Sequence, residues 1–197
     1  MYTVIGSVAS RTFRVLWMLE ELGASYEHVP AQAGSEEVRA HNPSGKVPVL
    51  IDDGVVLTDS TAILTYLADK HGALTHPAGT LDRARQDAVS FAILDELDAV
   101  LWTAARHSFV LPEELRVPQV KDSLRAEYAR NLARLTDRIA GPFVMGEMMT
   151  VPDILMTHCC NWAISAKFPE PDARLARYLS ALRARPAFGR ARALGKT

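Results

Sequence analysis

The chain has 197 residues, of which 48% are hydrophobic and 23% are charged, and its formal net charge is -1. This composition is typical of a folded globular protein and excludes a disordered chain. The near-neutral charge lacks the basic field needed for non-specific binding to nucleic acid or to a membrane surface, and we interpret the locally basic segment 174–196 as a solvated helix face.

The first 72 residues alternate between strand and helix patterns. Gly6 and Ser7 close a short apolar strand, and the apolar residues that follow recur at helical spacing until Gly23. Because a crossover between parallel strands needs a helix, this order predicts an α/β unit with a mixed four-stranded sheet and helices on both faces. The expected strands are 2–5, 26–29, 47–51 and 55–58, and the expected helices are 13–22, 35–41 and 59–71, with a hairpin at Asp52-Asp53-Gly54 and a helix stop at Gly72.

The rest of the chain carries only helical periodicity. Gly72, Pro77 and Gly79 lie among small and polar residues, which is typical of a linker. We therefore expect an α/β domain at 1–74, a linker at 75–81 and an all-helical domain at 82–197. The helices expected after the linker are 81–109, 117–140, 151–166 and 172–184, the last of which ends before Pro186.

The two cysteines, Cys159 and Cys160, are adjacent. Adjacent cysteines are poorly placed to bridge each other or to form a tetrahedral metal site, which excludes a disulfide framework. The N-terminus shows no signal-peptide pattern, and no uncharged run approaches the roughly 20 residues that cross a bilayer. We expect a cytoplasmic protein without a metal site and without a nucleic-acid or membrane partner.

Pro48 stands where a strand should begin, although a proline there cannot donate to the strand ladder. A cis Val47-Pro48 bond would turn the N–H and C=O of Val47 outward, where they could pair with an extended peptide. A trans proline that only opens an edge strand is the alternative.

Asp59 and Ser60 lie where a strand ends and a helix begins. Both residue types cap helices well, and capping alone is one interpretation. A helix N-terminus also offers free N–H groups and the positive end of a dipole, which can hold a carboxylate while the neighbouring acid pairs with an ammonium group. This second interpretation implies a ligand with an amino-acid-like end.

Together, Val47-Pro48 and Asp59-Ser60 resemble the glutathione site of cytosolic glutathione transferases. The resemblance extends to the strand–turn–helix opening and the helical second half, so it covers essentially the whole chain. Thr150-Val151-Pro152-Asp153 is similar to the family's structural N-capping box. The resemblance implies a thioredoxin-like domain that binds glutathione, an all-helical domain that shapes the second substrate's pocket, and a homodimer.

The resemblance also implies roles for the motif residues. Val47 would pair through its backbone with the cysteinyl part of glutathione, and Asp59 and Ser60 would bind the γ-glutamyl end. Lys46 is the better candidate for the glycyl carboxylate, and His41 is either a second candidate or an exposed residue at a helix end. The implied glutathione-binding set is His41, Lys46, Val47, Pro48, Asp59 and Ser60.

A glutathione site must hold the thiol as a thiolate, although a free thiol has a pKa of roughly 8.5. Ser7 and Ser10 are the hydroxyl candidates in the turn before the first long helix, and cysteine is absent there. Ser10 falls where the serine-type, theta-like transferases carry their catalytic hydroxyl. Arg11 either adds to the stabilisation of the thiolate or is a solvated charge. The zeta-type isomerases carry a serine-rich run with a cysteine here, and the segment Ala9-Ser10-Arg11 departs from it, which leaves the subclass open.

The second substrate would meet the turn at Val8 and Ala9 and a face of the first long helix. Trp102, Arg106 and Phe109 are three to four residues apart and would share that face. Trp102 and Phe109 could equally be core or dimer-interface residues. Arg106 in such a pocket would favour acidic or electron-rich acceptors.

The resemblance therefore implies a transferase of alkyl or aryl groups that conjugates glutathione, its co-substrate, to small hydrophobic electrophiles in detoxification. Glutathione-dependent disulfide or peroxide reduction, or isomerisation, is an alternative on the same fold. A non-catalytic protein on the same fold, either one that binds glutathione or a scaffold, is a third possibility, because a fold does not determine a function.

Overall fold

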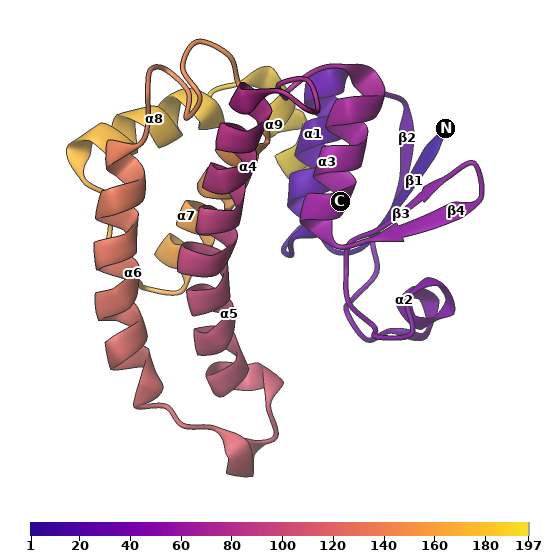
Figure 1. Ribbon diagram of the computed structural model, residues 1–197. Coiled ribbons are helices and arrows are strands. Elements are labelled where there is room, and N and C mark those ends of the chain that lie inside the picture. Colours follow the sequence, from indigo (N-terminus) through magenta and orange to yellow (C-terminus); the bar gives the residue numbers. More distant parts are fainter. Residues whose placement is uncertain (197) are drawn as a thin grey trace. The chain divides into compact units, whose positions relative to one another are not determined.

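The structure is a computed structural model that describes residues 1–196. The chain forms two compact units. The first unit joins Met1–Ala78 to the segment that begins at Ser180, and the second unit is Gly79–Leu179. The second half of the chain is helical, as expected, but its last segment belongs to the first unit (Figure 1). Thr197, the end of the expected helical domain, lies outside the described residues.

The first unit contains the expected mixed sheet of four strands in the order β2-β1-β3-β4. β1 pairs in parallel with β2 and antiparallel with β3, and β3 pairs antiparallel with β4. Asp53 and Gly54 both have positive φ in the turn between β3 and β4, which is the geometry of a two-residue hairpin loop. The strands are β1 (Tyr2–Ile5), β2 (Tyr26–Val29), β3 (Val49–Asp52) and β4 (Val55–Thr58).

Helices cover both faces of this sheet, as the alternating sequence pattern predicts (Figure 1). Ile5 and Val49 pack with Val38 of α2 on one face. Their neighbours Val4 and Leu50 are fully buried and point to the opposite face, because successive strand residues alternate. The helices are α1 (Thr12–Leu22), α2 (Glu36–His41) and α3 (Ser60–His71), and the left-handed Gly23 and Gly72 end α1 and α3 as expected.

A ninth α-helix, α9 (Pro186–Ala193), completes the first unit and has no counterpart in the expected elements. Proline at the first helical position needs no hydrogen-bond donor there, so Pro186 begins this helix instead of only ending the previous one. Phe188 packs edge-on against Trp17 of α1, with ring centroids 5.0 Å apart. The basic residues Arg190 and Arg192 are exposed, in agreement with a solvated helix face, whereas the opposite, apolar side of α9 is buried.

The second unit consists of helices. The expected helix 81–109 is one helical run that contains two π-helical turns, Leu94–Asp98 and Arg106–Val110. A π-helical turn shifts the phase of the helix, and an α-helical periodicity does not predict it. The remaining elements are α4 (Leu81–Ile93), α5 (Ala99–Ala105), a 3-10 turn (Glu113–Leu115), α6 (Val120–Asp137), α7 (Val151–Ser165) and α8 (Ala173–Arg183), which continues past the boundary of the unit.

Asp153 anchors the start of α7. Its fully buried carboxylate accepts the Thr150 N–H at 2.7 Å, which is the acidic half of the expected capping box. The same carboxylate accepts the Val144 N–H at 2.8 Å and the Tyr178 hydroxyl at 2.7 Å. Burial raises the pKa of Asp153, and these donors oppose the rise. The box is thus a structural centre of the second unit.

Candidate active site

Gly6 brings three segments of the first unit together. It ends β1 with a φ of 142°, a conformation that side-chain-bearing residues rarely adopt. A Cβ at this position would lie 2.2 Å from Thr12 Oγ1 and 2.9 Å from Val47 Cβ. The start of α1 and the residue before Pro48 therefore both lie against the same glycine.

Ser10 lies in the half-buried turn between Gly6 and α1. Its hydroxyl is 2.7 Å from the Ser7 carbonyl oxygen and 2.9 Å from Thr12 Oγ1, and its oxygen accepts the Thr12 N–H at 3.1 Å. A serine hydroxyl has one hydrogen, so it donates to only one of these acceptors at a time. The same hydrogen can turn to another acceptor, such as a sulfur anion, without breaking the turn.

Ser7, the alternative hydroxyl, is also half-buried. Its oxygen accepts the Ala9 N–H at 3.3 Å. Arg11 is half-buried in the same turn, immediately before α1. Ser7, Ser10 and Arg11 therefore all lie in the turn between β1 and α1, as the sequence predicts.

The Val47-Pro48 peptide bond is cis, so the first of the two alternatives for this motif is confirmed. The Val47 side chain is partly buried against Ile5 and Val49. Among residues 1–196, the N–H and C=O of Val47 take part in no hydrogen bond with the protein chain. Backbone groups at a partly buried position are normally paired, so Val47 offers a donor and an acceptor to an extended ligand.

The loop before Val47 is held by hydrogen bonds of its own. Asn42 Nδ2 donates to the Lys46 carbonyl at 2.9 Å, and the Gly34 N–H donates to the Gly45 carbonyl at 2.7 Å. Lys46 and His41 are both exposed, and His41 is the last residue of α2. The structure therefore places Lys46 next to Val47 with its side chain in solvent.

Asp59 caps α3, as the first interpretation of this motif expects. Its Oδ1 accepts the N–H groups of Thr61 at 2.9 Å and Ala62 at 3.0 Å. The Asp59 backbone has φ 68° and ψ 120°, a sparsely populated conformation for a residue with a side chain. Such conformations cluster at functional sites. Asp59 is exposed, so its carboxylate can also reach a ligand.

Ser60 is 3% exposed and accepts a hydrogen bond from Arg14 Nη1 of α1 at 3.2 Å. Arg14 is a residue that the sequence interpretation missed, together with Thr12 and Gly6. The signal for Arg14 is a charged residue inside the apolar run Phe13–Leu19, and both Arg14 and Thr12 are fully buried. Gly6 was identified in the sequence only as the end of the first strand, not as part of the site.

The predicted acceptor residues lie in different units. Val8 and Ala9 belong to the turn in the first unit, whereas Trp102, Arg106 and Phe109 belong to the second. Trp102 is half-buried on α5, and Arg106 and Phe109 are exposed on the π-helical turn that follows. Arg106 Nη2 donates to Thr103 Oγ1 at 3.3 Å. Their role in binding an acceptor stays a prediction.

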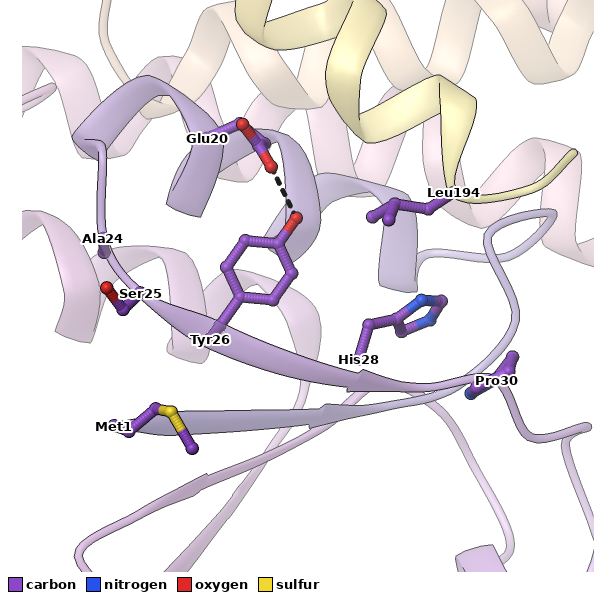
Figure 2. A pocket seen from close by; sticks show the side chains of 8 residues that line it. All are labelled: Met1, Glu20, Ala24, Ser25, Tyr26, His28, Pro30 and Leu194. Atoms are coloured by element: carbon purple, nitrogen blue, oxygen red, sulfur yellow. Dashed lines mark hydrogen bonds between the residues drawn. The ribbon is translucent and has the colours of Figure 1, made fainter. Parts of the chain in front are cut away.

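A surface cavity of about 630 Å³ lies beside the edge strand β2 (Figure 2). Tyr26 donates to Glu20 Oε1 across it at 2.6 Å, and burial, followed by this hydrogen bond, raises the pKa of Tyr26. His28 Nε2 lies 2.9 Å from the Gly6 carbonyl, and because a carbonyl only accepts, this nitrogen carries the proton. None of the predicted site residues lines the cavity, so it is separate from the turn that carries Ser10.

Within residues 1–196, no three His, Cys, Asp or Glu side chains are grouped so that they could hold a metal ion. Across the same part of the chain, no helix has the length and apolar character needed to span a membrane.

Comparison with known proteins finds related sequences and structures. Residues 4–76 match the family described as Glutathione S-transferase, N-terminal domain. A maleylacetoacetate isomerase from Rhizobium meliloti is 38% identical over 98 residues, which are 47% of this chain and 46% of that protein. A zeta class glutathione S-transferase from Euphorbia esula is 31% identical over 169 residues, which are 80% of this chain and 73% of that protein. The alignment thus spans less than half of the first relative and most of the second.

A solved structure also resembles the chain. The theta class glutathione S-transferase from the citrus canker pathogen Xanthomonas axonopodis pv. citri, crystallised with glutathione bound, is 26% identical with a TM-score of 0.78. The match covers 96% of both chains. The expected architecture, a thioredoxin-like first unit followed by a helical region, is confirmed.

Proposed function

Because the chain belongs to the glutathione transferase family, we propose that it binds glutathione in the first unit and transfers the glutathione thiolate to a small electrophile. The observation that carries the proposal is the unpaired backbone of Val47 beside the turn of Ser10. A cysteinyl residue that pairs with Val47 would bring its sulfur close to that turn.

The γ-glutamyl end of glutathione has an ammonium and a carboxylate group, and α3 begins with groups that suit both. The exposed Asp59 carboxylate pairs with the ammonium group. Ser60 and the N-terminus of α3 bind the carboxylate, because the helix dipole and a hydroxyl donor both favour an anion. Lys46, with His41 as the second candidate, binds the glycyl carboxylate at the other end of the tripeptide.

The thiolate then attacks the electrophile. Ser10 turns its hydroxyl hydrogen from the Ser7 carbonyl to the sulfur, which lowers the pKa of the thiol. The thiol proton passes to solvent, and the thiolate remains as the nucleophile. A carbon–sulfur bond forms as the leaving group departs with its electron pair, or as the electrons of an activated double bond move onto the acceptor. Arg11 contributes positive charge to the same turn.

Substitution of the two serines tests the role of Ser10. Ser10→Ala should lower kcat by tenfold or more and change the Kd for glutathione little, because the hydroxyl acts on the sulfur and not on the tripeptide backbone. Ser7→Ala is the matched control and should keep kcat within about twofold. A large loss in Ser7→Ala with normal turnover in Ser10→Ala would assign the thiol to Ser7 instead.

Isothermal titration with glutathione tests binding itself. We expect saturable binding at or below millimolar ligand, and its absence would favour a scaffold protein. Substrates should then be screened among electrophiles, disulfides and peroxides in the presence of glutathione.

We also propose that the protein is a homodimer in the cytoplasm. Light scattering should then give twice the chain mass of 21.6 kDa.

Isomerisation of a maleylacetoacetate-like substrate is the second candidate function. The Rhizobium meliloti relative and the zeta class relative favour it. The turn Ala9-Ser10-Arg11, which lacks a cysteine, favours conjugation. Glutathione-dependent conversion of the substrate's cis double bond to the trans form, without consumption of glutathione, would select the isomerase.

Arg106 tests the predicted acceptor pocket. Arg106→Ala should reduce kcat/KM for anionic electrophiles more than for neutral ones, because a guanidinium attracts an acidic acceptor. Equal losses for both kinds of electrophile would remove Arg106 from the pocket.

A further inference from the structure

Arg14 is a fully buried charged residue in the first turn of α1. It lies in the run from Phe13 to Leu19, whose other members are apolar. Burying a guanidinium costs several kcal/mol in solvation unless its interactions offset the loss, whereas an apolar side chain would fill the same space without that cost. A charge at this place calls for an explanation beyond packing.

The contact with Arg14 determines which hydrogen bonds the Ser60 hydroxyl can still make. A guanidinium only donates hydrogen bonds, so Arg14 Nη1, at 3.2 Å, occupies a lone pair of Ser60 Oγ. The hydroxyl hydrogen of Ser60 is then left for another acceptor. A donor that carries a positive charge also polarises the hydroxyl that accepts from it, which strengthens the next hydrogen bond in the chain.

The position of the contact directs that hydrogen toward the ligand. Ser60 is the first residue of α3 and follows the exposed Asp59. The charge of Arg14 therefore adds to the positive end of the α3 dipole, and both favour an anion at this point.

We propose that Arg14 is a positioning residue, which orients the Ser60 hydroxyl toward the α-carboxylate of the γ-glutamyl group and makes the site selective for a ligand with that carboxylate. The inference rests on the proposed function, because it places the γ-glutamyl end at Asp59 and Ser60. Arg14 acts through Ser60 and does not touch the reacting sulfur.

The test compares two ligands. Glutathione carries the α-carboxylate, and 4-aminobutyryl-cysteinylglycine lacks it but keeps the ammonium, thiol and glycyl groups. Wild-type protein should bind glutathione more tightly, by calorimetry. Arg14→Met should weaken glutathione binding about tenfold and change analogue binding less than twofold, because only the carboxylate loses its oriented donor. The KM for glutathione should rise while kcat at saturation stays within twofold.

Three further variants make the test specific. Ser60→Ala combined with Arg14→Met should be no worse than Ser60→Ala alone, because the two residues form one chain of hydrogen bonds. Arg14→Lys keeps a charged donor and should recover part of the selectivity, and it supplies the comparison if Arg14→Met does not fold. Arg83→Met, which removes another buried arginine, from the second unit, should leave selectivity unchanged.

The outcomes separate the inference from the proposed function. Equal weakening of both ligands in Arg14→Met, or additive losses with Ser60→Ala, would mean that Arg14 only supports the fold, and would overturn the inference alone. The inference alone would also be overturned if the wild-type protein bound glutathione and the analogue equally well. Wild-type protein that binds neither ligand at millimolar concentration would overturn both.

Discussion

Gly6 illustrates how one residue sets the geometry of the candidate site. It has no side chain, and this absence allows Thr12 and Val47 to lie close to the end of β1. Thr12 in turn contacts Ser10, so Gly6 sets the separation between the turn of Ser10 and the backbone of Val47.

Gly6→Ala should therefore affect stability and binding together. The new Cβ would collide with Thr12 Oγ1 and Val47 Cβ, and the φ of 142° would be strained in any residue other than glycine. We expect a loss of about 2 kcal/mol or more in the free energy of unfolding and a weaker Kd for glutathione. Urea unfolding and calorimetry measure the two effects. Gly54→Ala, whose Cβ would meet nothing within 4 Å, should leave the Kd unchanged.

Asp52 provides a pH-dependent contribution to stability. Its carboxylate accepts from Lys70 and from the Tyr66 hydroxyl at 2.6 Å. The Lys70 hydrogen bond, followed by that of Tyr66, lowers the pKa of Asp52 below its ordinary value of 3.8. Because the folded pKa lies below the unfolded one, the contribution is complete above that ordinary value and is lost as the pH falls below it.

Asp52→Asn should consequently lower the urea midpoint at pH 7. The difference from the wild type should stay constant down to about pH 5 and shrink below about pH 4, as the wild-type carboxylate becomes protonated. Urea titrations between pH 7 and pH 3 measure this difference. A difference that does not change with pH would show that the effect comes from packing instead of charge.

Site residues could be predicted where the sequence itself carries the pattern. Val47-Pro48 and Asp59-Ser60 stand at element boundaries, where local chemistry indicated a ligand site, whereas the family resemblance favoured Ser10 over Ser7. Arg14 and Thr12 could not be assigned in this way. Their roles come from contacts with Ser60 and Ser10, and whether a side chain at a helix start meets such partners depends on how the chain folds.

At the scale of elements, the strands and helices of the first unit follow the predicted order, because hydrophobic periodicity and glycine stops are local signals. β3 begins at Val49, two residues after the predicted start, since the cis Val47-Pro48 bond precedes the ladder. The π-helical turns and α9 were not predicted. An α-helical periodicity does not predict the phase shift of a π-helical turn, and the sequence pattern uses Pro186 only as a helix stop although proline also suits a first turn.

The start of α7 is held by the carboxylate of Asp153, so substitution of this residue tests how much that one group stabilises the second unit. Asp153→Ala should lower the free energy of unfolding by about 3–5 kcal/mol, because it leaves buried donors of Thr150, Val144 and Tyr178 without an acceptor. Thermal unfolding followed by circular dichroism measures the loss. Asp122→Ala, an exposed acid in the first turn of α6, is the control and should cost under about 1 kcal/mol.

At the scale of the whole molecule, the first unit is built from both ends of the chain. α9 packs against α1 through Phe188, which contacts Phe13 at 5.1 Å and Trp17 at 5.0 Å between ring centroids. Arg185 forms two hydrogen bonds of 2.7 Å with the Glu21 carboxylate. The linker composition and the helical periodicity after it predicted two domains. No local signal in the sequence shows that a helix far along the chain packs in the first unit.

Phe188→Ala should therefore destabilise the first unit. Removal of a buried phenylalanine costs about 3–5 kcal/mol, and Trp17, now fully buried, should gain solvent exposure. Urea unfolding and the emission wavelength of tryptophan measure the two effects. Arg190→Ala removes a more exposed ion pair with Glu20 and should cost less than about 1 kcal/mol. A similar cost for both variants would mean that α9 is held by charge instead of by the aromatic contact.

The return of α9 has a consequence for biosynthesis. Arg185 and Glu21 are 164 positions apart in the sequence, so a ribosome makes α1 long before the helix that covers it. At roughly 5–20 residues per second, that interval is about ten to thirty seconds. During this time the nascent first unit lacks part of its core, and its apolar surface is available to chaperones. A premature stop before α9 would therefore damage the first unit, which the ribosome began to make first.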